Sequence, residues 1–93
     1  MNSERIVLVT GASRGIGAAI ADALAAAGHP VVGTATTQAG ADGIGERLGD
    51  AGIGVVMDVA DDASVEAGLK AATEALGAPL ILINNAGITR DNL

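Results

Sequence analysis

The 93-residue sequence contains no cysteine and no aromatic residue of any kind. The lack of cysteine excludes a disulfide framework and a thiolate metal site. The lack of Phe, Tyr and Trp means that the core must be built from Ile, Val, Leu and Ala, and that no phenolic hydroxyl can act as a catalytic acid. We therefore expect an aliphatic core, formed where helices pack against a sheet.

Positive charge is also scarce, with five Lys and Arg residues against eleven Asp and Glu residues and a formal net charge of -6. Binding to a nucleic-acid backbone depends on clustered Lys and Arg, so this composition argues against DNA or RNA as a partner. The only histidine, His29, cannot form a metal cluster alone and is expected in a solvated turn before Pro30. The only lysine, Lys70, is expected on the surface of a helix.

The N-terminal region has no long hydrophobic run. The apolar stretch after Arg5 is far shorter than the core of a signal peptide or the roughly 20 residues of a membrane span. Ninety-three residues suffice for one small domain at most. These features predict a soluble, cytoplasmic protein without a membrane partner.

Four short apolar runs predict strands, at residues 6–9, 31–36, 53–57 and 80–83. Continuous aliphatic runs without polar alternation are typical of strands covered on both faces, as in a parallel sheet. The stretches between these runs must then supply the crossover connections.

Those three stretches have apolar residues at helical spacing. The first begins at Gly15 and stops at Gly28, a typical residue after a helix end. The second covers residues 38–52, although Gly40, Gly43, Gly45 and Gly49 lie inside it and each costs about 1 kcal/mol in a helix interior. The third follows Asp61, a suitable N-cap, and stops at Gly77. Its expected buried stripe consists of Val65, Leu69, Ala72 and Leu76.

The order βαβαβαβ predicts an α/β fold with a Rossmann-type doubly wound parallel sheet, of which residues 1–93 form the first, nucleotide-binding half. Right-handed crossovers place the strands in the order three, two, one, four, with the first two helices on one face and the third on the other. Strand four then has a free edge. We therefore expect residues 1–93 to be the N-terminal part of a larger single-domain protein.

The first strand leads into Thr-Gly-Ala-Ser-Arg-Gly-Ile-Gly at residues 10–17, where the first helix begins. Such a turn presents open backbone N–H groups at a helix N-terminus and is a suitable site for a pyrophosphate. Gly11 suits the tight turn, Gly15 lets the backbone approach the phosphates, and Gly17 allows the helix to pack close to the strand. A purely structural turn is the alternative.

The residues after the second strand bear on the choice of dinucleotide. NAD-binding sites often have a carboxylate there, about twenty residues after the loop, which accepts hydrogen bonds from the ribose 2′-hydroxyl. Here Thr34, Ala35 and Thr36 occupy the region, and no acid is present. Arg14 is suited to a 2′-phosphate through a bidentate guanidinium, and Thr36 can add a hydroxyl donor. The pattern favours NADP(H) over NAD(H); a plain surface arginine and a turn threonine are the alternatives.

Asp58 and Val59 follow the third strand at the carboxyl edge, where ligands bind in open α/β sheets. Asp58 is therefore predicted either to hydrogen-bond an adenine amino group or to cap the helix that begins near Asp61.

Three motifs occur in order on these elements: Thr-Gly-x-x-x-Gly-Ile-Gly at residues 10–17, Asp-Val at 58–59 and Asn-Asn-Ala-Gly at 84–87. Together they resemble the short-chain dehydrogenase/reductase family, and the resemblance extends from about Arg5 to the end of the sequence. In that family the last motif stabilises the central sheet and lines the cofactor site, which implies such roles for Asn85, Ala86 and Gly87. The residues alone show that Asn84 and Asn85 carry amides able to tie down a loop.

Within the family, Gly-Thr-Ala-Thr at residues 33–36 and Gly-Ile-Thr-Arg-Asp-Asn-Leu at 87–93 resemble the reductases of 3-oxoacyl-(acyl-carrier-protein) thioesters in bacterial fatty acid synthesis. This resemblance implies NADPH as cofactor, an acyl-carrier-protein thioester as substrate and a homotetrameric full-length enzyme. Acetoacetyl-CoA reductases share part of the tail and are the second candidate, with other short-chain ketoreductases. A non-catalytic nucleotide-binding module is the alternative from another class.

The catalytic Ser, Tyr, Lys and Asn of that family fall outside residues 1–93, so no catalytic residue is assigned and no metal ligand is expected. The residues expected to bind the cofactor are Gly11, Ser13, Arg14, Gly15, Ile16, Gly17, Thr36, Asp58, Val59, Asn85, Ala86 and Gly87.

Overall fold

The computed structural model describes residues 5–79 and 81–85, in which strands and helices alternate as the sequence predicts. None of the helices in this part of the chain is long and apolar enough to cross a membrane. In chain order the elements are β1 (Val7–Val9), α1 (Gly15–Ala26), β2 (Val31–Ala35), α2 (Gln38–Leu48), the 3-10 helix η2 (Gly49–Ala51), β3 (Gly52–Val56), α3 (Asp62–Ala75) and β4 (Ile81–Ile83).

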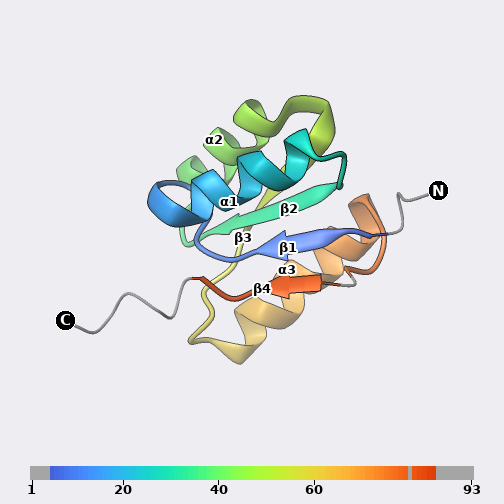
Figure 1. Cartoon of the computed structure of the whole chain (residues 1–93). Coiled ribbons are helices and arrows are strands. Elements are labelled where there is room, and N and C mark those ends of the chain that lie inside the picture. The colour runs from blue at the N-terminus through green and yellow to red at the C-terminus, as the bar shows by residue number, and fades with distance from the viewer. Residues whose placement is uncertain (1–4, 80, 86–93) are drawn as a thin grey trace.

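The four strands form one parallel sheet in the order β3-β2-β1-β4, and the arrows of β1, β2 and β4 in Figure 1 point the same way. In this register Val7 of β1 is paired with Val31 of β2 and with Ile81 of β4. The strand order predicted from right-handed crossovers is therefore confirmed.

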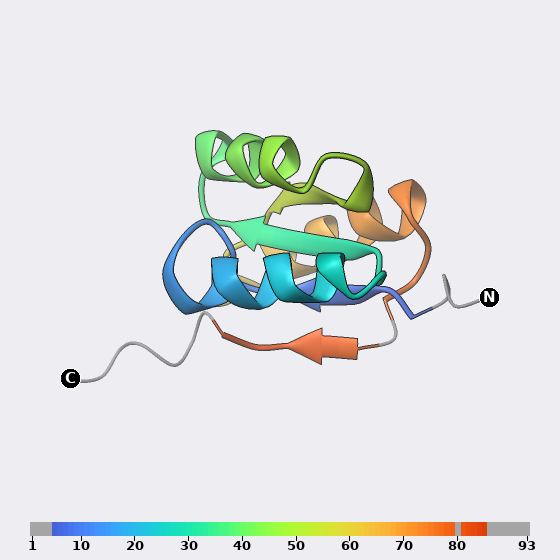
Figure 2. The same ribbon diagram turned by 45° about the horizontal axis from the view of Figure 1, so that its top comes forward.

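The helices divide between the two faces of the sheet. Successive side chains of a strand point to opposite faces, so Val7 and Val9 pack on one side with Ala21 of α1 and Ile44 of α2. On the other side, Leu8 belongs to a second cluster with residues of α3. Figure 2 shows α1 in front of the sheet and α3 behind it. The prediction of two helices on one face and one on the other is confirmed.

The second helix is shorter than predicted. The structure ends α2 at Leu48 instead of continuing to residue 52, because the chain turns at Gly49 with φ +57 and enters a 3-10 turn. One glycine of α2 has a packing reason, because a Cβ on Gly40 would lie 2.7 Å from Cβ of Ala35. On the neighbouring strand, a Cβ on Gly54 would collide with the backbone of Ala41. The backbones of α2 and β3 therefore lie in direct contact.

The buried stripe predicted for α3 is only partly correct. Ala72 is fully buried and Val65 packs against the core, but Leu69 is 40% exposed and Leu76 36% exposed. Leu69 faces a shallow apolar groove beside β4, where Leu82 is 63% exposed. The apolar edge predicted for strand four is present in the described residues, and it leaves part of this sheet face open.

Candidate nucleotide-binding site

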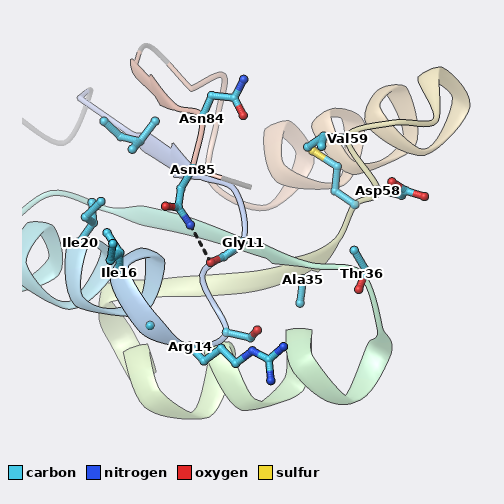
Figure 3. A pocket seen from close by; sticks show the side chains of 14 residues that line it. Gly11, Arg14, Ile16, Ile20, Ala35, Thr36, Asp58, Val59, Asn84 and Asn85 are labelled. Carbon is cyan, nitrogen blue, oxygen red and sulfur yellow. Dashed lines mark hydrogen bonds between the residues drawn. The ribbon is translucent and has the colours of Figure 1, made fainter. Parts of the chain in front are cut away.

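A cleft of about 730 Å³ opens where the four parallel strands end, within the range of roughly 300–1,000 Å³ typical of small-molecule sites. Each strand is followed by residues that line it, so the sheet topology itself gathers the site (Figure 3). The lining consists of Gly11, Ser13, Arg14, Gly15, Ile16, Ile20, Ala35, Thr36, Met57, Asp58, Val59, Ile83, Asn84 and Asn85.

The loop after β1 delivers an uncapped helix N-terminus to this cleft. Arg14 is the N-cap residue of α1 and makes no side-chain capping bond, and the first turn of α1 holds no acidic residue. The first helical hydrogen bond runs from the N–H of Ala18 to the carbonyl of Arg14, so the amides of residues 15–17 precede it. By contrast, Thr37 caps α2 and Asp61 caps α3. The open end of α1 is therefore a suitable partner for an anion.

Two glycines of the loop adopt the left-handed conformation, Gly11 with φ +63 and Gly15 with φ +65. A Cβ on Gly15 would meet nothing within 4 Å, because the residue borders the open cleft. The absence of a side chain at Gly15 thus serves the backbone conformation and keeps the space in front of it free.

Gly17 lies under the loop and does not line the cleft. A Cβ at this position would collide with the carbonyl oxygen of Gly11 and lie 2.7 Å from Nδ2 of Asn85. The packing role predicted for this glycine agrees with the structure, although its partners are the loop and the end of β4 as well as the strand. Contact between Gly17 and a ligand stays a prediction.

Thr34 of β2 anchors the loop, a role that the sequence did not predict. Thr34 is 1% exposed, its Oγ1 accepts a hydrogen bond from the N–H of Gly11 at 3.3 Å, and its carbonyl accepts one from Ala12 at 2.8 Å. A threonine pointing inward at the end of a buried strand is the only sequence signal for such a role.

The end of β4 ties the loop from the opposite side. The side chain of Asn85 donates from Nδ2 to the carbonyl of Gly11 at 3.2 Å, drawn as a dashed line in Figure 3. The N–H of Asn85 also donates to Oγ1 of Thr10 at 2.9 Å. The expectation that an amide of this motif ties down a loop is confirmed for Asn85.

Arg14 and Thr36 both line the cleft and both are exposed, whereas no carboxylate follows β2. Thr37 caps α2 by accepting a hydrogen bond from the N–H of Gly40 at 3.0 Å. The capping role therefore belongs to Thr37, and the hydroxyl of Thr36 remains at the cleft.

The two alternatives for Asp58 are separated by the neighbouring residues. Asp61 is the residue that caps α3, through hydrogen bonds to Oδ1 from the N–H groups of Ala63 and Ser64. Asp58 instead accepts from the N–H of Ala60 at 3.0 Å, which closes a turn, and it lines the cleft together with Val59. Capping by Asp58 is thus not observed, and its contact with an adenine stays a prediction.

A comparison with known families identifies this arrangement. Residues 5–93 match the family model of the short chain dehydrogenases. The chain belongs to the short chain dehydrogenase family.

Several curated relatives in this family are similar to the whole chain. It is 56% identical to the 3-oxoacyl-(acyl-carrier-protein) reductase FabG of Vibrio cholerae over 94 residues, which cover 100% of this chain and 38% of the relative. It is 55% identical to FabG of Escherichia coli, with the same coverage. It is also 55% identical to FabG of Pseudomonas aeruginosa over 92 residues, 96% of this chain and 37% of the relative. The chain thus spans little more than a third of the length of these proteins.

As a short chain dehydrogenase, the protein carries most of its predicted cofactor residues at one cleft. Nine of the twelve line it, Gly17 lies beneath it, and Ala86 and Gly87 lie outside the described residues. Ile16 is 73% exposed at the cleft, although its helical spacing also suited a core position. The lining residues that were not predicted from the sequence are Ile20, Ala35, Met57, Ile83 and Asn84. Most of them are apolar residues at strand ends. The sequence pattern alone does not distinguish such residues from residues of the core.

Proposed function

We propose that this chain is the NADPH-binding part of a single-domain reductase that converts 3-oxoacyl-(acyl-carrier-protein) to 3-hydroxyacyl-(acyl-carrier-protein). The observation that carries the cofactor assignment is the uncapped N-terminus of α1, which opens onto the cleft beside Arg14. Similarity to FabG proteins over the whole chain supports the reaction and the substrate class.

The residues at the cleft fit a dinucleotide with a 2′-phosphate. The amides of residues 15–17 and the positive end of the α1 dipole would hold the pyrophosphate. Arg14 and Thr36 would bind the 2′-phosphate, because a guanidinium forms strong charge-assisted hydrogen bonds with phosphate oxygens. A carboxylate after β2 would repel that phosphate, and none is present.

The adenosine would lie against the ends of β3 and β4. Asp58 can accept a hydrogen bond from the adenine amino group, and Val59 offers apolar contact to the ring. Asn85, Ala86 and Gly87 would border the ribose; of these, Asn85 lies at the cleft in the described part of the chain. Ser13 and Ile16 complete the phosphate end.

NADPH supplies the hydride when it is bound. The ketone oxygen also needs a proton, and general acids typically contribute about 10² to 10⁴-fold to such reactions. No Tyr occurs in the 93 residues, and the only His, His29, lies in the turn after α1, away from the cleft lining. We therefore assign binding and orientation of the cofactor to this chain, and proton donation to residues outside it.

The assignment is tested by measuring NADPH oxidation by the full-length protein with acetoacetyl thioesters of acyl-carrier protein and of CoA. We expect the higher kcat/KM with the carrier-protein thioester. A preference for the CoA thioester would favour the second candidate, an acetoacetyl-CoA reductase. Tight NADPH binding without turnover of either thioester would favour a non-catalytic nucleotide-binding module. Residues 1–93 alone should show no turnover.

We also propose that the full-length protein is a cytoplasmic homotetramer, as the resemblance to this family implies. Light scattering on the purified full-length protein measures the assembly directly. A monomeric mass at micromolar concentration would contradict the tetramer without affecting the cofactor assignment.

A further inference from the structure

Arg47 of α2 contacts the glycine loop from the side away from the cleft. Its Nη2 donates to the carbonyl oxygen of Ala12 at 3.0 Å, and its Nε donates to Oδ1 of Asp22 on α1 at 3.0 Å. One guanidinium thus joins the last turn of α2, the loop after β1 and the middle of α1. Neither Arg47 nor Asp22 is among the residues that line the cleft.

The contact fixes the orientation of one peptide unit in the loop. Ala12 is fully buried, and its N–H already donates to the carbonyl of Thr34 at 2.8 Å. Its carbonyl is held by Arg47, so both backbone polar groups of Ala12 have defined partners on different elements. The peptide that joins Ala12 to Ser13 is trans, so this carbonyl and the N–H of Ser13 point in opposite directions. The N–H of Ser13 is therefore directed away from Arg47, and Ser13 is a cleft residue.

We propose that Arg47 is a positioning residue of the cofactor site, which orients the amide donors of the loop without touching the ligand. This inference rests on the proposed function, because it takes the loop to hold the pyrophosphate. The pyrophosphate is common to NADPH and NADH. Arg47 thus acts on the affinity for both nucleotides, whereas Arg14, at the cleft, discriminates between them.

The bond to the loop, and not the ion pair, carries this role. The side chains of Arg47 and Asp22 are 33% and 52% exposed, so solvent screens their mutual attraction. Asn at position 22 would keep an oxygen that can accept from Nε of Arg47. Lysine at position 47 offers one ammonium in place of a planar fork and cannot reproduce both bonds in the same geometry.

The test combines two measurements on the full-length protein: hydrogen exchange without nucleotide, and titration with NADPH and with NADH. Arg47→Ala should speed amide exchange at Gly11 and Ala12, whose N–H groups donate to Thr34, but not in β2. It should also lower the affinity for both nucleotides by the same factor, about tenfold, as expected for one misplaced hydrogen bond. Arg47→Lys should give an intermediate loss, and it keeps the inference testable if the alanine variant folds poorly. Asp22→Asn should bind both nucleotides nearly as the unsubstituted protein does.

Arg5→Ala is the matched control for charge, because it also removes one exposed arginine. Arg5 precedes β1 and so lies at the amino-terminal end of the strands, opposite the cleft. It should change neither exchange nor affinity. Equal losses in Arg5→Ala and Arg47→Ala would overturn the inference in favour of a long-range charge effect. Unchanged affinity and exchange in Arg47→Ala, with normal binding by the unsubstituted protein, would overturn it as well. If the unsubstituted protein binds neither nucleotide, the proposed function fails, and the role of Arg47 in binding fails with it.

Discussion

Asn85 and Gly11 are 74 positions apart in the chain, yet Nδ2 of Asn85 donates to the Gly11 carbonyl at 3.2 Å (Figure 3). This bond joins the end of β4 to the first residue of the glycine loop after Thr10. Because β4 pairs with β1, the loop is held at the point where the sheet positions the cleft. The geometry of the glycine loop at the cleft thus depends on a residue that is far from it in sequence.

Replacing this amide should loosen the loop. Asn85→Ala removes the donor and should lower the free energy of unfolding by about 1 kcal/mol. Asn85→Asp should cost more, because it brings a carboxylate oxygen toward the Gly11 carbonyl. Chemical denaturation measures both effects. Gln38→Ala removes another side-chain amide, which donates to Asp42 on the exposed face of α2, and serves as control. If Asn85→Ala is as stable as this control, the bond does not hold the loop.

Arg14 should determine the preference for NADPH. A charge-assisted hydrogen bond contributes about 1.5 to 3 kcal/mol. Arg14→Ala should therefore lower the affinity for NADPH roughly ten- to hundredfold and change the affinity for NADH little. Calorimetric titration of the full-length protein with each nucleotide measures the two affinities. Equal weakening of both nucleotides would show that Arg14 does not bind the 2′-phosphate.

The sequence was sufficient for the topology and for the position of the glycine loop, because both follow from local patterns. Aliphatic runs, helical spacing and the handedness of crossovers predict the strand order, and the glycines of residues 10–17 mark a turn that few other residues can form. The partners of side chains were less predictable. Thr34 meets Gly11 across 23 positions and Arg47 meets Ala12 across 35, and only the packed sheet brings them together.

The burial of apolar side chains was also not fully predictable from the sequence. The helical spacing of Leu69 indicates which face of α3 is apolar, but it carries no information on whether anything covers that part of the face. In the described residues Leu69 remains 40% exposed beside β4. In the same way, the apolar character of Ile16 did not indicate whether it packs in the core or lines the cleft, as the structure places it.

Thr34 and Thr37 offer a contrast between loop anchoring and helix capping. Thr34→Val keeps the side-chain shape but leaves the N–H of Gly11 without this acceptor, which should cost about 1 to 3 kcal/mol of stability and weaken NADPH. Thr37→Ala removes the N-cap of α2 and should cost about 1 kcal/mol without changing NADPH affinity. Thermal unfolding and titration of both variants separate the two effects. Equal NADPH affinities for the two variants would contradict the anchoring role of Thr34.

The central claim is that the loop after β1 holds the cofactor, and titration of Gly15→Val with NADPH tests it most directly. Gly49→Val is the matched control, because both glycines have a positive φ, +65 at Gly15 and +57 at Gly49. A Cβ at either position would meet no atom within 4 Å. Gly49, however, lies at the far end of α2 and is not a cleft residue. Both variants should keep the far-UV circular dichroism of the full-length protein. Gly15→Val should lose NADPH affinity on the order of a hundredfold or more, as for one or two charge-assisted hydrogen bonds, while Gly49→Val binds normally. Unchanged NADPH affinity in Gly15→Val would contradict the account.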